Sequence, residues 1–249
     1  MIESNIPKVL LTDGNYKHTW AASKALFSNG HVVHAIGGKR SLVSSSKYVE
    51  KVVFKGLKLL DSNLESFLEL LITENYDVVL GIGANSVEFL SRNREAITQH
   101  AKLILPPKIS LEIALNKMKS LEIASNLRIN VPRSAKVERL SDIEKHKSWL
   151  TRPFIIKSSS ELRKDFDTLY FDNYDHFRDV SLNLKELDHS ALIQERIFGI
   201  GEAFCGIYNN GTLINHAMHR RLRENPISGG PSTKAEIIFK QDLFHEGAK

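Results

Sequence analysis

Short apolar segments alternate with longer amphipathic ones over the first hundred residues, and this alternation restricts the fold more than any other feature of the chain. An apolar strand at residues 9–12 precedes an amphipathic helix at 18–28, which stops at Asn29-Gly30. Strands that alternate with helices form a parallel sheet covered on both faces. We therefore predict a doubly wound α/β domain at residues 1–105. Its further expected elements are strands at 31–36, 49–54 and 77–82 and helices at 60–73 and from Ser86.

Ligands of such domains bind beyond the carboxyl ends of the strands, which here are residues 12–16, 37–40 and 81–86. The first turn, Thr12-Asp13-Gly14-Asn15-Tyr16, lacks the glycine fingerprint of a dinucleotide fold, so an NAD site is not expected. The Asp13-Gly14 pair fits a tight turn and a substrate contact equally well.

The composition excludes several classes of protein. Hydrophobic residues make up 42% and charged residues 25% of the 249 residues, which is a normal globular mixture. The net charge of +5 is spread along the chain, so it suits small anionic ligands and gives no argument for nucleic acid. We find no secretory signal and no apolar run of about 18 residues, the length that a membrane helix needs. No membrane partner is therefore expected.

Cys205 is the single cysteine of the sequence. One thiol excludes an intramolecular disulfide and fits a reducing compartment, so we expect a cytoplasmic protein. Its place in an alternating strand favours a core side chain over a nucleophile.

The Leu105-Pro106-Pro107 segment marks a boundary, because prolines interrupt strands and helix interiors. We expect a second domain at residues 106–249, beginning with a helix that Ser110 caps and that runs to about Leu127.

An apolar strand that ends in Lys157 follows a short strand at 135–137 and a polar helix from Ser141. A lysine at the end of such a strand is partly desolvated and can reach an anion, although lysines in this position often extend into solvent.

The segment from Leu192 to Thr233 carries most of the candidate chemistry. Its apolar strand runs into Gln194-Glu195-Arg196-Ile197, and Glu202 follows Glu195 by seven residues. Three further features follow in this segment, and each of them alone is common on protein surfaces. Their order along the chain indicates a binding site for a polyanion, because guanidinium groups match phosphate and carboxylate. These features are the turn Asn209-Asn210-Gly211, the cluster of Arg220, Arg221 and Arg223, and the loop Gly229-Gly230-Pro231.

These motifs, together with the Asn116-Lys117 pair, resemble the ATP-grasp enzymes, in particular carboxylate-amine ligases similar to the carbamoyl-phosphate synthetase large chain. The resemblance extends from about Lys8 to Ala235. It implies a doubly wound pre-ATP-grasp domain followed by an α+β ATP-grasp domain that is incomplete at its C-terminus.

The resemblance also implies roles for individual residues. Lys117 and Lys157 would contact the phosphates of ATP, and Glu202 would receive the ribose hydroxyls. Glu195, Arg196 and Ile197 would form the adenine hinge. The arginines Arg220, Arg221 and Arg223 would be catalytic by binding the carboxylate substrate or the transferred phosphoryl group, and Arg223 is favoured over Arg220.

Two features depart from the family pattern. The loop at residues 158–165 is not rich in glycine, and no Asp or Glu at residues 236–246 has a Glu-x-Asn companion to hold magnesium. We therefore assign no metal ligand, although the resemblance implies Mg²⁺ for the complete enzyme. The expectation is a fragment of a longer protein or a shortened protein with weak or absent turnover.

The function that the resemblance implies is ATP-dependent ligation of a small-molecule carboxylate to an amine through an acylphosphate. A homodimer is compatible with it. The alternatives are a catalytically inactive nucleotide-binding or regulatory protein of the same fold and a nucleotide-sugar enzyme. The identities of the carboxylate and the amine do not follow from the sequence.

Overall fold

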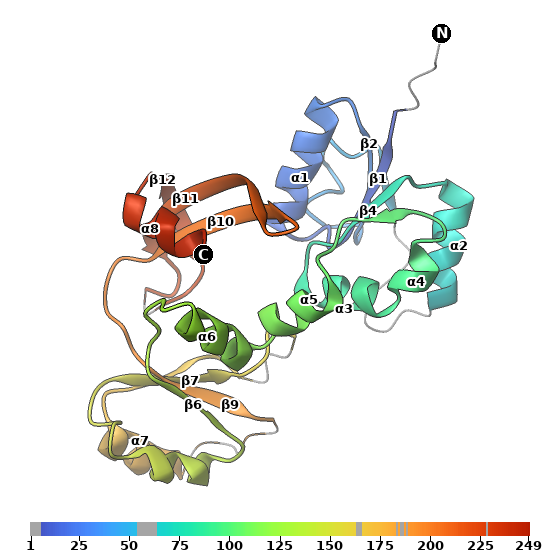
Figure 1. Ribbon diagram of the computed structural model, residues 1–249. Coiled ribbons are helices and arrows are strands. Elements are labelled where there is room, and N and C mark those ends of the chain that lie inside the picture. Colours follow the sequence, from blue (N-terminus) through green and yellow to red (C-terminus); the bar gives the residue numbers. More distant parts are fainter. Residues whose placement is uncertain are drawn as a thin grey trace. The chain divides into compact units, whose positions relative to one another are not determined.

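The computed structural model describes residues 6–53, 64–162, 166–182, 184, 187, 189–227 and 229–249 (Figure 1). The chain forms two compact units. The first reaches Asn116 and includes a short segment that begins at Ser160, and the second contains Lys117–Ser159 and the rest of the chain. Residues 106–116, which we expected to open the second domain, group with the first unit.

The first unit contains a five-stranded sheet in which every strand pair is parallel. The strand order is β3-β2-β1-β4-β5. The strands are β1 (Lys8–Leu11), β2 (Val32–Ile36), β3 (Lys51–Val53), β4 (Val78–Leu80) and β5 (Lys102–Leu103). The helices are α1 (Lys17–Ser28), α2 (Leu64–Glu74), α3 (Ala84–Arg92), α4 (Arg94–Ile97) and α5 (Lys108–Ala114).

Helices cover both faces of this sheet because the β1 side chains alternate between two cores. Leu10 packs in one core with Phe67 of α2 and Leu90 of α3. Val9 and Leu11 belong to the other core, against which α1 packs. This arrangement confirms the predicted doubly wound sheet. Residues 54–63, which include the end of the expected strand at 49–54 and the start of the helix expected at 60, lie outside the described residues.

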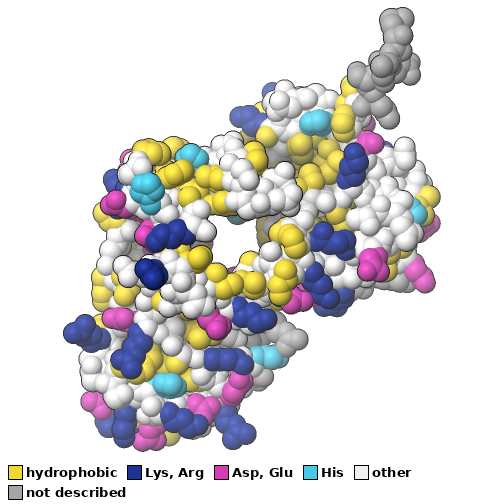
Figure 2. Space-filling view, viewed as in Figure 1, with side chains coloured by type: hydrophobic (Ala, Val, Ile, Leu, Met, Phe, Trp, Pro, Cys, Tyr) yellow, Lys and Arg dark blue, Asp and Glu magenta, His cyan; other side chains and the backbone are white. Residues whose placement is uncertain are grey.

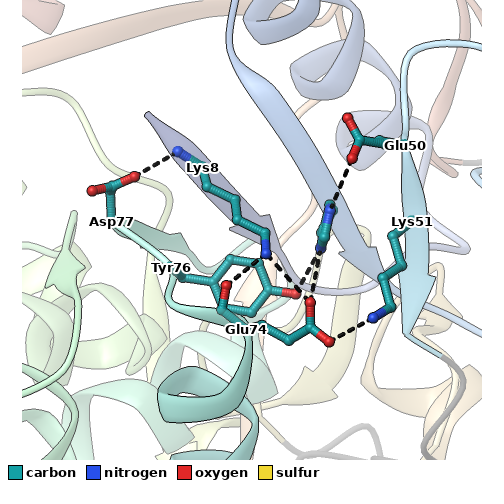
Figure 3. Close-up of polar contacts among 7 residues, drawn as sticks. Lys8, Glu50, Lys51, Glu74, Tyr76 and Asp77 are labelled. Atoms are coloured by element: carbon teal, nitrogen blue, oxygen red, sulfur yellow. Dashed lines mark hydrogen bonds and ion pairs between the residues drawn. The ribbon is translucent and has the colours of Figure 1, made fainter. Parts of the chain in front are cut away.

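A polar cluster connects three strands of this sheet to the end of α2 (Figure 3). The Glu74 carboxylate forms ion pairs with Lys8 of β1 and Lys51 of β3. Beside it, the Nδ1 atom of buried His34 in β2 lies within hydrogen-bond distance of the Tyr76 hydroxyl. Each buried polar group of the pair has a partner, which removes the cost of its desolvation.

The second unit contains two antiparallel sheets. The four-stranded sheet has the order β6-β9-β7-β8, and η1, a short 3-10 helix, and α7 contribute to the core on one of its faces. The three-stranded sheet has the order β10-β11-β12, and α8 packs against β10 through contacts such as Phe244 with Phe204. The elements are α6 (Lys117–Asn126), β6 (Ser134–Val137), η1 (Leu140–His146), β7 (Phe154–Ser158), β8 (Leu169–Phe171), α7 (Tyr174–Ser181), β9 (Ala191–Glu195), β10 (Glu202–Asn209), β11 (Thr212–Glu224), β12 (Ser232–Ile237) and α8 (Gln241–Gly247).

The predicted hairpin is confirmed. Asn210 and Gly211 connect β10 to β11 with φ angles of 47° and 80°, which Asn and Gly adopt more readily than other residues.

Three local predictions are wrong. The single helix expected from Ser110 to Leu127 is interrupted between α5 and α6, because Asn116 forms a bridge with Ser160. The helix expected from Ser141 is the 3-10 helix η1. Cys205 is exposed and does not fill a core, because the β10 face that carries it has no buried neighbour in the described chain.

Candidate functional site

Strand alternation places Lys157 on the face of the four-stranded sheet opposite the helix-covered core. Phe154 and Ile156 of β7 and Ile193 of β9 lie in that core, so Lys157 and Gln194 project from the other face. The Lys157 ammonium donates a hydrogen bond to Gln194 Oε1 at 2.8 Å. The lysine expected to contact phosphate therefore has a fixed position on this face.

Gln194 is a residue that the sequence reasoning missed. Its Nε2 donates to Ser134 Oγ at 2.9 Å, so one chain of hydrogen bonds crosses β7, β9 and β6. Gln194 is buried, and its two bonds satisfy both ends of its amide. The alternation of β9 could have identified it, because Gln194 is the polar residue that shares a face with Leu192.

The start of α6 is attached to the end of β7. Lys117 is the first residue of α6, and its backbone N–H donates to the Ser159 carbonyl at 3.1 Å. Ser159 lies two residues after Lys157. The structure therefore brings the segments of the two expected phosphate contacts next to one another. Residues 163–165 of the loop at 158–165 lie outside the described residues.

Backbone hydrogen bonds hold the expected adenine hinge in place. The N–H of Glu195 donates to the Arg133 carbonyl at 2.8 Å, and the N–H of Arg196 donates to the Pro153 carbonyl at 2.9 Å. The Arg196 guanidinium lies 4.9 Å from the ring centre of Tyr170. Ile197 is 67% exposed. The Glu195 side chain shares the helix-covered face with Ile193, so the structure does not bring its carboxylate to the Lys157 face.

Glu202 lies directly opposite Arg220 in the β10–β11 pair. Its two carboxylate oxygens accept hydrogen bonds from Lys240 Nζ at 2.8 Å and from Arg220 Nε at 3.1 Å. These bonds, with Lys240 as the larger cause, hold the pKa of Glu202 below its ordinary value. The ionised carboxylate can accept further hydrogen bonds from hydroxyl groups. Lys240 is a second residue that the sequence reasoning missed, since it lies 38 positions from Glu202.

The three arginines of β11 have different partners. Arg220 lies between the carboxylates of Glu202 and Glu236, at 3.1 and 3.4 Å. Arg221 pairs with Glu224 at 3.1 Å. Arg223 donates to the neutral hydroxyl of Thr233 at 2.9 Å.

This difference separates the arginines by charge. Carboxylates of the described chain balance Arg220 and Arg221, whereas the charge of Arg223 has no carboxylate partner within that part of the chain. Arg223 is therefore the best placed of the three to bind an anion.

The Asp13 carboxylate accepts hydrogen bonds within the first unit. Its oxygens bind the Gly83 N–H at 2.8 Å and the Ser86 hydroxyl at 2.9 Å, which fastens the turn after β1 to the start of α3. Its φ angle is 59°. Of the two interpretations that the sequence left open, this geometry favours the structural turn over the substrate contact.

Across residues 6–53, 64–162 and the later described segments, no group of three His, Cys, Asp or Glu side chains is arranged to hold a metal ion. No described helix combines the length and the apolar character that crossing a membrane requires.

No protein-family model and no curated protein matches the sequence. Solved structures do match its fold. An N5-carboxyaminoimidazole synthetase from Staphylococcus aureus, complexed with ADP, is 13% identical, with a TM-score of 0.64 over 89% of this chain and 56% of that chain. An L-amino acid ligase from Bacillus licheniformis is 16% identical, with a TM-score of 0.65 over 97% and 58%.

A third match is the biotin carboxylase domain of a Hydrogenobacter thermophilus 2-oxoglutarate carboxylase, in complex with ADP and its magnesium salt. It is 18% identical, with a TM-score of 0.57 over 86% of this chain and 49% of that chain. The protein therefore has the fold of the ATP-grasp ligases, and the sequence-based prediction of the fold is confirmed. The chain spans 49–58% of the length of these three structures.

Proposed function

We propose that this chain is the nucleotide-binding part of an ATP-dependent ligase that joins a small-molecule carboxylate to an amine. The observation that carries the proposal is the fixed position of Lys157, which Gln194 holds on the face of the sheet opposite the helix-covered core. The fold supports it, because two of the three structures described above are complexes with ADP.

The described residues fit a nucleotide. Lys157 and Lys117 would bind its phosphates, because their segments are joined through the Ser159 carbonyl. Glu202 would accept the ribose hydroxyls, for which its ionised state is suited. At the hinge, the backbone N–H of Ile197 makes no hydrogen bond within the described chain and would donate to the adenine ring.

Arg223 is the proposed contact for the reacting anion. Fixed positive charge stabilises a transferred phosphoryl group and the carboxylate that receives it. Bound ATP supplies the phosphoryl group that turns the carboxylate into an acylphosphate, from which an amine displaces phosphate to give the amide. Among the described residues no group of three His, Cys, Asp or Glu side chains is arranged to hold a metal ion, and no step is assigned to magnesium. A cytoplasmic location and a homodimer are further parts of the proposal.

The lack of a group of three metal-ligating side chains among the described residues favours a second candidate, a nucleotide-binding protein of the same fold without catalysis. Both candidates require that ATP binds. They differ in whether ADP and phosphate appear when carboxylates and amines are added.

Calorimetric titration of the 249-residue protein with ATP, with and without magnesium, tests the proposal. We expect Lys157→Ala to weaken ATP binding by about tenfold or more, the loss of one charge-assisted contact. Lys147→Ala is the matched control, because Lys147 is an exposed lysine that pairs with Glu144 next to η1, on the helix-covered side of the same sheet. A folded protein that gives no heat with ATP contradicts the proposal, as does equal weakening by the two variants.

A further inference from the structure

A pocket lies in the second unit, at the end of the four-stranded sheet where β9 stops and β7 begins. Its volume is about 320 Å³. The side chains that matter to the argument are Arg133, Trp149, Arg152, Pro153, Phe154 and Glu195. This volume is at the lower end of the range for small-molecule sites.

The pocket is separate from the proposed phosphate contacts. Phe154 and Glu195 lie directly opposite one another in the β7–β9 pair, and both belong to the helix-covered face. Lys157 and Gln194 project from the other face of the same strands. The nucleotide proposed above therefore leaves this pocket unexplained.

Charge of both signs lines the pocket. Figure 2 shows Lys and Arg side chains interspersed with Asp and Glu over the part of the molecule that contains β6, β7, β9 and α7. Within the part of the chain that the structure describes, Arg133, Arg152 and Glu195 form no ion pair with one another or with any other side chain. Two exposed cations and one partly buried anion thus lie around one small cavity without an ion-pair partner in the described chain.

The Arg133 side chain and the backbone around the pocket are held in place before any ligand binds. The Arg133 guanidinium lies 5.0 Å from the ring centre of Trp149. The backbone of Glu195 is bonded to Arg133, and that of Arg196 is bonded to Pro153. A ligand would therefore meet Arg133 and the backbone already in place, and binding would order the Arg152 and Glu195 side chains.

We propose that this pocket binds a free α-amino acid with an apolar side chain. The ligand carboxylate pairs with the guanidinium groups of Arg133 and Arg152, and the ligand ammonium pairs with the Glu195 carboxylate. The apolar side chain packs against Trp149 and Pro153. A zwitterion matches this lining because it neutralises charges of both signs at once, whereas a simple anion leaves Glu195 unpaired.

The probe is L-leucine, and the readout is the fluorescence of Trp149 in the Trp20→Phe protein, where Trp149 is the one remaining tryptophan. No nucleotide is present, so the result is independent of the proposed ligase function. We expect a saturable fluorescence change with L-leucine. N-acetyl-L-leucine, which lacks the ammonium, and isopentylamine, which lacks the carboxylate, should each bind about tenfold or more weakly.

Substitutions test whether L-leucine binds in this pocket. Glu195→Gln should weaken L-leucine by about tenfold, and Glu138→Gln, at an exposed glutamate of β6's end, should not. The proposal is overturned if neither the fluorescence saturates nor calorimetry detects heat up to about 50 mM L-leucine. This concentration is well above the Kd of a useful binding site. Equal binding of L-leucine and N-acetyl-L-leucine also overturns it, and calorimetric titration makes this comparison on the protein without any substitution.

Discussion

The Nδ1 atom of His34 lies 2.9 Å from the hydroxyl oxygen of Tyr76, and both side chains are buried in the first unit. Burial lowers the pKa of His34, and the nearby Lys8 ammonium lowers it further, against opposing effects of Glu50 and Glu74. Burial also raises the pKa of Tyr76. The pair is therefore neutral around pH 7, as a buried hydrogen bond between uncharged groups requires.

This pair predicts acid sensitivity of the first unit. A histidine whose pKa is lower in the folded state binds protons more readily when unfolded, so its contribution to stability is present above the unfolded pKa of about 6.5 and is lost as pH falls toward the folded pKa. We expect the free energy of unfolding to fall between pH 7 and pH 5, and His34→Gln to remove part of that dependence.

The measurement is urea unfolding followed by Trp20 fluorescence in the Trp149→Phe protein, since Trp20 lies in α1 of the first unit. His18→Gln is the control, because His18 is an exposed histidine of α1, the helix that also carries Trp20. Stability that is constant from pH 7 to pH 5 would show that protonation of His34 is not coupled to folding.

Two glycines of the first unit should differ in their tolerance of alanine. A Cβ atom at Gly14 would lie 2.6 Å from Val43 Cγ2 and 2.8 Å from the Ile36 carbonyl oxygen. At Gly38 a Cβ atom has no neighbour within 4 Å. We expect Gly14→Ala to lower the free energy of unfolding by about 1–3 kcal/mol through overpacking, with Gly38→Ala close to neutral. Comparable stability of the two variants in urea would contradict this account of the turn.

We expect substitution of Asp13 to lower the stability of the first unit, since its carboxylate has a structural role in the turn. Asp13→Ala removes the acceptor for the Gly83 N–H and the Ser86 hydroxyl, and it places alanine at a φ angle of 59°. We expect a loss of about 2–4 kcal/mol from these two effects together. Asp13→Asn should cost less, because asparagine tolerates positive φ and keeps one acceptor. If Asp13→Ala unfolds like the unaltered protein, Asp13 has no structural role.

The sequence predicted those parts of the fold that depend on interactions between residues close together in the chain. Strand and helix periods over the first hundred residues led to the parallel sheet, and Asn210-Gly211 led to the hairpin. The helix break between α5 and α6 was not predictable in this way, because the partner of Asn116 is Ser160, 44 positions later.

The candidate site shows the same division. The alternation of β7 and β9 would have placed Lys157 beside Gln194 once the strands were known to pair, but their register does not follow from either segment alone. The same register turns the Glu195 carboxylate to the opposite face. The roles of Lys117, Arg196, Ile197 and the β11 arginines stay predictions, which ligand binding has to test.

The proposed role of Glu202 can be tested most sharply, because its proposed ligand contact involves two specific hydroxyl groups. If its carboxylate accepts the ribose hydroxyls, the protein should prefer ATP over 2′,3′-dideoxy-ATP by about tenfold, the value of hydrogen bonds to a charged acceptor. Glu202→Gln should remove most of that preference, as measured by calorimetric titration with both nucleotides.

Glu236→Gln is the matched control for Glu202→Gln. Both glutamates pair with Arg220, so each variant removes one ion pair of the same arginine, but Glu236 has no proposed contact with the nucleotide. We expect Glu236→Gln to keep the preference for ATP. Loss of the preference in both variants would mean that Arg220, released from its partners, changes the site, and that Glu202 does not bind the ribose directly.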